Sequence, residues 1–140
     1  MSLSFQIATG SGDDTIRIWD MRSLKALHTI PAHKSTVSDL RFFRGDRSDQ
    51  TTPPMNAPVN SASQGPKLEL RDTDLQFTEG LCLVSSGYDG TVKIWSADEW
   101  QLAKTLSTDA GKVMTVDVSP GGAFIASGSW NRSIQLYARE

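Results

Sequence analysis

The chain has 140 residues, of which 38% are hydrophobic and 21% charged, a composition typical of one ordinary globular domain. No apolar run approaches the roughly 20 residues of a membrane-spanning helix, and the first residues lack the basic and apolar regions of a secretory signal. The formal charge of -2 argues against bulk electrostatic binding to nucleic acid, and the single Cys82 cannot form an internal disulfide, which is usual in a reducing compartment.

Short β-strands are predicted along the chain, without a convincing helix. In chain order we expect a hairpin over 7–19, strands over 25–30 and 37–42, a hairpin over 83–95, strands over 102–106 and 113–118, and a hairpin over 125–137. The three hairpins align: each has an apolar stretch, a Ser or Thr, a Gly, a turn Asp or Asn, an alternating strand and a final aromatic residue. Alternation places Val92 and Ile94 on one face of the second hairpin and Trp95 on the other.

A long insertion separates the first two hairpins. Trp95 and Tyr137 are 42 residues apart, whereas Trp19 and Trp95 are 76 apart. The surplus falls in residues 44–79, a polar stretch that is rich in Pro, Ser and Asn and buries too little apolar surface to fold alone. We expect this insertion to be flexible, although its end, over 67–77, has the alternation of a short strand.

The second repeat carries a set of residues that is typical of a known family. A histidine before an inner strand, a serine in the hairpin, a turn aspartate and a closing tryptophan occur together as His33, Ser85, Asp89 and Trp95. With the 42-residue period, the chain resembles the WD40 repeat family of β-propellers. The resemblance implies that the four side chains form a hydrogen-bonded tetrad, which would lock two strands and a loop together, because buried polar groups are costly unless paired.

The other two repeats hold partial tetrads. In the third repeat, Asp109 occupies the histidine position, and in the first repeat that position lies before residue 1. The remaining members are Thr9, Asp13 and Trp19 in the first repeat and Ser127, Asn131 and Tyr137 in the third.

The resemblance implies an all-β fold, a fragment of a WD40 propeller with about two and a half four-stranded antiparallel blades. Residues 1–22 would supply two strands of one blade, 23–97 a second blade interrupted by 44–79, and 98–140 a last blade that lacks its outer strand. Unpaired strand edges and uncovered apolar faces favour self-association, which we therefore expect of the isolated chain.

His33, Ser85 and Asp89 are also the residue types of a hydrolytic triad. However, the sequence contains neither a nucleophile elbow nor a sign of an oxyanion hole, so we do not expect an enzyme. The histidines and the cysteine show no metal-ligand spacing, and no motif indicates a cofactor.

Three residues are candidates for partner binding. Tyr88 and Trp130 each stand directly before the turn Asp or Asn, where the first repeat has Gly12. A large aromatic residue at a propeller rim is costly to expose and is a candidate anchor for a partner, with packing against a neighbouring turn as the alternative. Asp39 is a weaker candidate.

Two stretches are more discriminating than the general WD40 pattern. Residues 29–33, Thr-Ile-Pro-Ala-His, and 111–114, Gly-Lys-Val-Met, resemble the C-terminal blades of WD-repeat components of the spliceosomal U4/U6 small nuclear ribonucleoprotein. This resemblance implies a nuclear, non-enzymatic scaffold in pre-mRNA splicing. Its partners would be proteins of that particle, its RNA contact indirect or weak, and no membrane would be involved. The alternative is a WD40 adaptor in another assembly, such as a ubiquitin ligase or chromatin complex.

Overall fold

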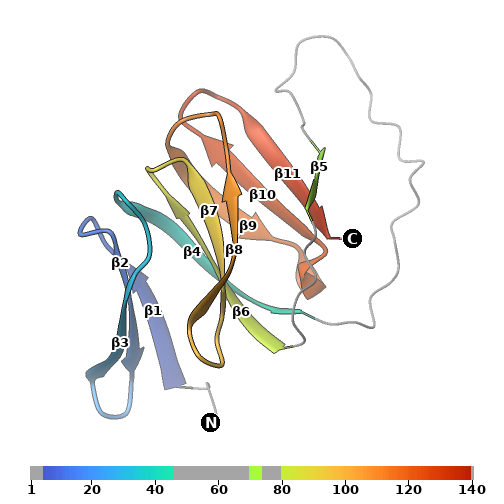
Figure 1. The fold of residues 1–140 in the computed structure, drawn as a ribbon. Coiled ribbons are helices and arrows are strands. Elements are labelled where there is room, and N and C mark those ends of the chain that lie inside the picture. Colours follow the sequence, from blue (N-terminus) through green and yellow to red (C-terminus); the bar gives the residue numbers. More distant parts are fainter. Residues whose placement is uncertain (1–4, 46–69, 74–79, 140) are drawn as a thin grey trace.

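The computed structural model describes residues 5–45, 70–73 and 80–139, and nearly all of them lie in strands or in the turns between strands (Figure 1). The strands are β1 (Gln6–Gly10), β2 (Thr15–Asp20), β3 (Lys25–Pro31), β4 (Val37–Gly45), β5 (Leu70–Thr73), β6 (Gly80–Gly87), β7 (Thr91–Ser96), β8 (Gln101–Ser107), β9 (Val113–Val118), β10 (Phe124–Ser129) and β11 (Ile134–Arg139). A 3-10 turn, Pro120–Gly122, precedes β10. Within the described ranges, the structure holds no helix with the length and apolarity needed to cross a bilayer.

The strands form three sheets that follow one another along the molecule (Figure 1). Their strand orders are β1-β2-β3, β4-β6-β7-β8 and β5-β11-β10-β9. Within the sheets, every pair except β5–β11 is antiparallel, and each of the three expected hairpins forms. The all-β propeller architecture expected from the repeats is therefore confirmed.

The sheets end one strand later than the sequence repeats. β3 pairs with β2, and β8 pairs with β7. The boundaries expected at residues 22 and 97 therefore mark where the sequence repeats end, whereas each sheet also includes the strand that follows the boundary. In both places a tight turn leads directly from the hairpin into the outer strand, and its last residue, Leu24 or Trp100, has a left-handed φ of 55°. Because the turn reverses the chain within a few residues, the next strand pairs with the strand it has just left.

The last sheet has four strands, whereas we expected its outer strand to be missing. β5, from within the insertion, pairs in parallel with β11 and occupies the outer position. A strand edge presents unpaired N–H and C=O groups, and β5 satisfies them along one side of β11. β4 continues to Gly45, so the insertion begins at residue 46 rather than 44. Apart from β5, the insertion lies outside the described residues, and its expected flexibility stays a prediction.

Two apolar layers lie between successive sheets, and the central sheet contributes to both. On β6, Leu83 faces the first sheet, while Cys82 and Val84 face the third. The first layer comprises Ile16, Ile18, Ile30, Ala32, Val37, Leu83, Trp95, Ala97 and Trp100. The second comprises Cys82, Val84, Val92, Ile94, Leu106, Val113, Val116, Ile125 and Tyr137. Val92 and Ile94 thus face away from Trp95, as their alternation predicts.

The free edge of the first sheet is uncovered. Among the described residues no strand pairs with the outer side of β1, and Phe5 and Ile7 at this edge are each 45% exposed. Such an edge is a template for pairing with another chain, so the expected self-association remains a prediction.

Candidate functional site

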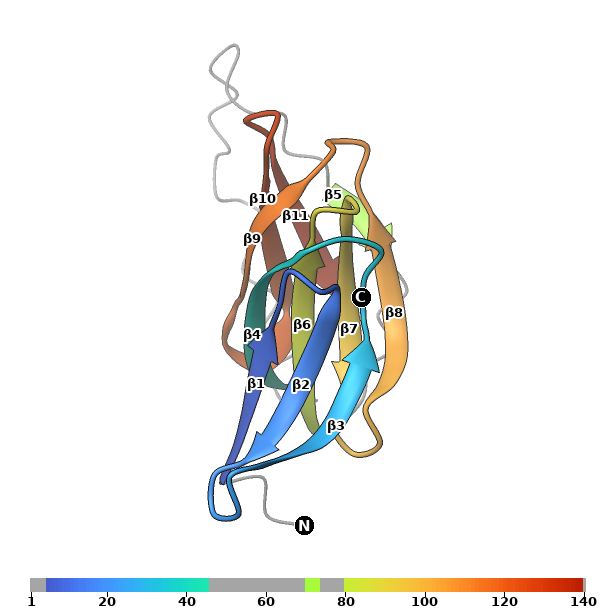
Figure 2. The same cartoon turned by 90° about the vertical axis from the view of Figure 1, so that its left-hand side faces the viewer.

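The turns and connections that carry the candidate residues gather at one end of the three sheets (Figure 2). We call this end the loop rim, and it consists of residues 11–14, 32–36, 88–90, 108–112 and 130–133. The opposite end carries the β2–β3 turn (Figure 2).

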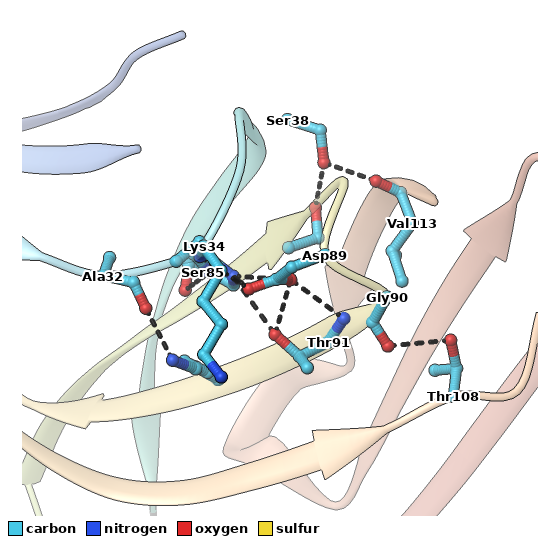
Figure 3. A network of polar contacts seen from close by, with 12 residues as sticks. Ala32, Lys34, Ser38, Ser85, Asp89, Gly90, Thr91, Thr108 and Val113 are labelled. Carbon is cyan, nitrogen blue, oxygen red and sulfur yellow. Dashed lines mark hydrogen bonds and ion pairs between the residues drawn. The ribbon is translucent and has the colours of Figure 1, made fainter. Parts of the chain in front are cut away.

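A repeated side-chain motif builds each hairpin turn. Asp89 Oδ1 accepts hydrogen bonds from the backbone N–H of Thr91 at 3.1 Å and from its hydroxyl at 2.7 Å (Figure 3). Gly90 between them has a φ of 81°, a conformation that suits glycine. The same pair of bonds recurs between Asp13 and Thr15 and between Asn131 and Ser133. The sequence carries a signal for this motif, because each of the three hairpins has a Ser or Thr two positions after its turn Asp or Asn. The pattern by which we align the hairpins does not include this residue.

The structure brings together the four residues of the second repeat. The indole Nε1–H of Trp95 donates to Ser85 Oγ at 3.0 Å, and Ser85 Oγ lies 2.8 Å from His33 Nε2. The other ring nitrogen of His33, Nδ1, lies 3.1 Å from both carboxylate oxygens of Asp89. Strands β6 and β7, their turn and the β3–β4 connection are thereby joined by one chain of side-chain contacts.

The donors in this chain fix its protonation. The indole can only donate and the Asp89 carboxylate can only accept, so in a neutral His33 ring the proton lies on Nδ1 and is donated to Asp89, while Nε2 accepts a hydrogen bond from the Ser85 hydroxyl, which accepts from the indole. Burial lowers the pKa of His33 below its ordinary value, and the attraction of Asp89 does not offset this effect. The ring is therefore neutral at physiological pH.

Asp89 is the charged end of the chain. Burial acts to raise the pKa of Asp89, but hydrogen bonds from the Lys34 backbone N–H, the Thr91 hydroxyl and the His33 ring outweigh it and lower the pKa (Figure 3). The carboxylate is thus an acceptor whose oxygens are occupied by donors of the same molecule.

Gly87 makes the close approach of His33 and Asp89 possible. A Cβ added at Gly87 would lie 2.4 Å from His33 Nδ1 and 2.8 Å from Asp89 Oδ1, well inside van der Waals contact. Gly128 of the third repeat aligns with Ser86 rather than with Gly87, and a Cβ added there would have a methyl carbon of Thr115 as its nearest atom, at 3.1 Å. The sequence shows a glycine in each repeat but not that the second one is enclosed by the tetrad.

The partial tetrads are assembled to different degrees. In the first sheet, Trp19 Nε1–H donates to Thr9 Oγ1 at 2.8 Å, while Asp13 forms its exposed turn and an ion pair with Arg17. In the third sheet, the Tyr137 hydroxyl donates to Gln135. Ser127 Oγ, also in the third sheet, is buried without a hydrogen-bond partner among the described residues. Only the second repeat therefore forms the whole chain of contacts.

The triad-like residues are not placed for hydrolysis. Ser85 is 0% exposed and the His33 side chain is fully buried, so a substrate has no access to the hydroxyl in this conformation. Ser85 also accepts from Trp95, as a structural serine would. The described part of the chain contains no group of three or more His, Cys, Asp and Glu residues arranged to hold a metal ion.

Asp39 lies between sheets and does not project from the loop rim. Its Oδ2 accepts hydrogen bonds from the Thr115 hydroxyl at 2.8 Å and from the Val116 N–H at 3.2 Å, which joins β4 to β9. A second bridge runs from Ser38, whose hydroxyl donates to the Val113 carbonyl oxygen at 2.7 Å (Figure 3). Both oxygens of the Asp39 carboxylate are occupied within the chain, the other by Arg41, so Asp39 has a structural role between sheets, and its part in partner binding stays a prediction.

Tyr88 and Trp130 lie on the loop rim with a lysine between them. The Lys112 Nζ is 5.1 Å from the centre of the Tyr88 ring and 5.8 Å from that of Trp130. Tyr88 is partly buried, whereas Trp130 is 72% exposed. The sequence indicated the two aromatic residues but not Lys112, whose place in the β8–β9 connection is close to them only in three dimensions.

Comparison with known proteins places the chain in a family. The family model described as "WD domain, G-beta repeat" matches residues 1–20, 70–96 and 100–137. The U4/U6 small nuclear ribonucleoprotein PRP4 of Saccharomyces cerevisiae is 35% identical over 68 residues, covering 46% of this chain. Protein HIR1 of Phaeosphaeria nodorum is 24% identical over 157 residues, covering 94% of this chain. The chain spans 15% of the length of each of these relatives.

A solved structure shares the arrangement of strands. The crystal structure of the WD40 beta propeller domain of Doa1 superposes with a TM-score of 0.66 at 21% identity, covering 96% of this chain and 33% of that one. WD40 propellers are typically scaffolds for protein–protein interaction rather than enzymes. With its family match over more than half of its length, this chain belongs to the WD40 repeat family.

Proposed function

We propose that the chain is part of a WD40 scaffold in a U4/U6 small nuclear ribonucleoprotein, acting in pre-mRNA splicing in the nucleus. The observation that carries this proposal is the 35% identity to PRP4, a higher identity than HIR1 has. Residues 29–33 and 111–114, the stretches that resemble U4/U6 components, both lie on or beside the loop rim.

The geometry supports a scaffold. The polar groups of the tetrad are internally paired, and they fix the loops of the rim without leaving a reactive group exposed. Trp130 and the cations Lys34, Lys112 and Arg132 are exposed on the loops themselves, where a protein partner can reach them. With a formal charge of -2, the chain favours protein partners over direct binding to the phosphate backbone.

A WD40 adaptor in another multiprotein assembly is the second candidate. One observation favours it: the match to HIR1 covers 94% of this chain, against 46% for PRP4.

Affinity purification of the full-length protein from nuclear extract distinguishes the two candidates. We expect U4 and U6 RNA and the proteins of their particle to be enriched over the same purification with an unrelated WD40 protein. After nuclease treatment, the protein partners should remain bound, because the contacts are made by protein. Recovery of a different set of proteins, without U4 and U6 RNA, would reject the spliceosomal proposal and support the adaptor.

A further inference from the structure

The most exposed aromatic side chain among the described residues is Trp130, and it stands on the loop rim. It belongs to the β10–β11 turn, while Tyr88 belongs to the β6–β7 turn of the neighbouring sheet. Lys112 lies between the two rings, within the distance of cation–π attraction. We call these three residues the rim cluster.

The backbone holds the rim cluster in place. The Trp130 N–H donates to the Lys112 carbonyl oxygen at 2.8 Å, and the Tyr88 N–H donates to the Thr36 carbonyl oxygen at 2.9 Å. The Trp130 turn is thus joined to the β8–β9 connection, and the Tyr88 turn to the β3–β4 connection, before any partner arrives. A surface that is already ordered loses little conformational entropy on binding, which favours affinity.

The loop rim carries charged side chains of both signs, and two of its cations lie in or next to the rim cluster. Lys34, Lys112 and Arg132 are exposed on the loop rim. Two aspartates of the same rim are engaged within the chain, since Asp89 is held by the tetrad and Asp13 pairs with Arg17. The other acidic residues of the rim are Asp14 and Asp109, so the rim as a whole is not basic; its positive charge is local, with Lys112 in the rim cluster and Arg132 in the same turn as Trp130.

We propose that the rim cluster docks an acidic peptide segment of a partner protein that carries one large apolar side chain. The apolar side chain would cover the Trp130 ring, and a carboxylate beside it would pair with the Lys112 ammonium, which the two rings hold in position. This inference rests on the proposed scaffold function but not on which particle the scaffold belongs to. Single-stranded RNA is disfavoured, because it requires a continuous basic groove with several stacking surfaces, and the rim offers three cations and one open ring.

The test is binding of synthetic peptides to the 140-residue chain, measured by fluorescence anisotropy. The probe is a fluorescein-labelled peptide in which glutamates flank one leucine. Its counterparts replace the leucine with glycine, or the glutamates with lysines, and a uridine oligonucleotide serves as the RNA probe. We expect the first peptide to bind, Trp130→Ala to weaken it about tenfold, and Lys112→Gln to weaken it about threefold and reduce its salt dependence.

Matched control variants lie at the opposite end of the sheets. Met21→Ala removes a side chain that is 54% exposed, and Lys25→Gln removes an exposed lysine, so both should leave the affinity unchanged. As a second measurement on the unaltered chain, bound peptide should protect one tryptophan from quenching by acrylamide, and this protection should disappear in Trp130→Phe.

Several outcomes would overturn the inference. These are no binding of the acidic peptide, equal binding of the glycine or lysine counterpart, stronger binding of the RNA, or an affinity that Trp130→Ala leaves unchanged. The proposed function fails separately: if U4 and U6 RNA are not recovered with the full-length protein while the peptide still binds to Trp130, the docking surface stands and the assignment to that particle falls.

Discussion

Replacing His33 with alanine tests the structural role of the tetrad most directly. The ring bonds to Ser85 through Nε2 and to Asp89 through Nδ1, and its side chain is fully buried. Its removal therefore takes one partner from each of two enclosed polar groups and leaves the ring's volume to be filled by water or by relaxation.

The expected cost is about 3 kcal/mol of unfolding free energy. A buried hydroxyl that loses its acceptor costs about 1–3 kcal/mol, and this applies in full to Ser85, which has no exposed surface. A hydrogen bond to a charged group contributes about 1.5–3 kcal/mol to stability. The loss at Asp89 should be at the lower end of that range, because the N–H groups of Lys34 and Thr91 still donate to its carboxylate. Asp109→Ala is the matched control, since the replaced residue occupies the equivalent position, is exposed, and should change stability by no more than about 0.5 kcal/mol.

The assay is urea unfolding followed by tryptophan fluorescence, at one protein concentration so that self-association affects all variants equally. The reasoning also predicts that Ser85→Ala and His33→Ala cost less together than the sum of the single changes, because both remove the same hydrogen bond. Equal losses for His33→Ala and Asp109→Ala, or strict additivity of the two tetrad changes, would refute it.

Three further predictions follow from the same geometry. Gly87→Ala should destabilise the chain by about 2 kcal/mol or more and Gly128→Ala by less, because the added methyl group meets the tetrad at 2.4 Å in one case and a methyl carbon at 3.1 Å in the other; similar melting temperatures would contradict this. The pKa of His33 is lowered in the folded chain, so near and below pH 6.5, the ordinary pKa, the unfolded chain binds more protons than the folded chain. The free energy of unfolding should therefore fall as the pH drops from about 7.5 to 5, by at most about 1.4 kcal/mol per pH unit. His33→Gln should flatten this dependence, whereas His28→Gln, at an exposed position, should leave it unaltered, and urea midpoints across the pH range decide the matter. Finally, the uncovered edge of β1 should make the isolated chain self-associate at micromolar concentration, and a monomer by light scattering with cooperative melting would show otherwise.

Local sequence was a good guide to the strands and to the tetrad. Val92 and Ile94 alternate with Trp95, and a period of two admits only one arrangement of these side chains about a strand. The resemblance to the WD40 family predicted that His33, Ser85 and Asp89 meet, even though more than 50 residues separate the histidine from its partners.

Contacts between repeats were harder to predict from the sequence. Asp39 was a candidate for partner binding because nothing in β4 shows that Thr115 and Val116 of another sheet will reach its carboxylate. Lys112 was not singled out, since its attraction to Tyr88 and Trp130 depends on how two sheets are placed side by side.

The sequence by itself determined what each repeat needs within its own hairpin: the alternation, the turn Asp or Asn, and the closing aromatic residue, all of which act over a few residues. Only the tertiary structure decided that Asp39 joins β4 to β9, that β5 occupies the open edge of β11, and that Lys112 lies between two aromatic rings. These outcomes depend on distances between segments that are far apart along the chain, and no local spacing encodes such distances.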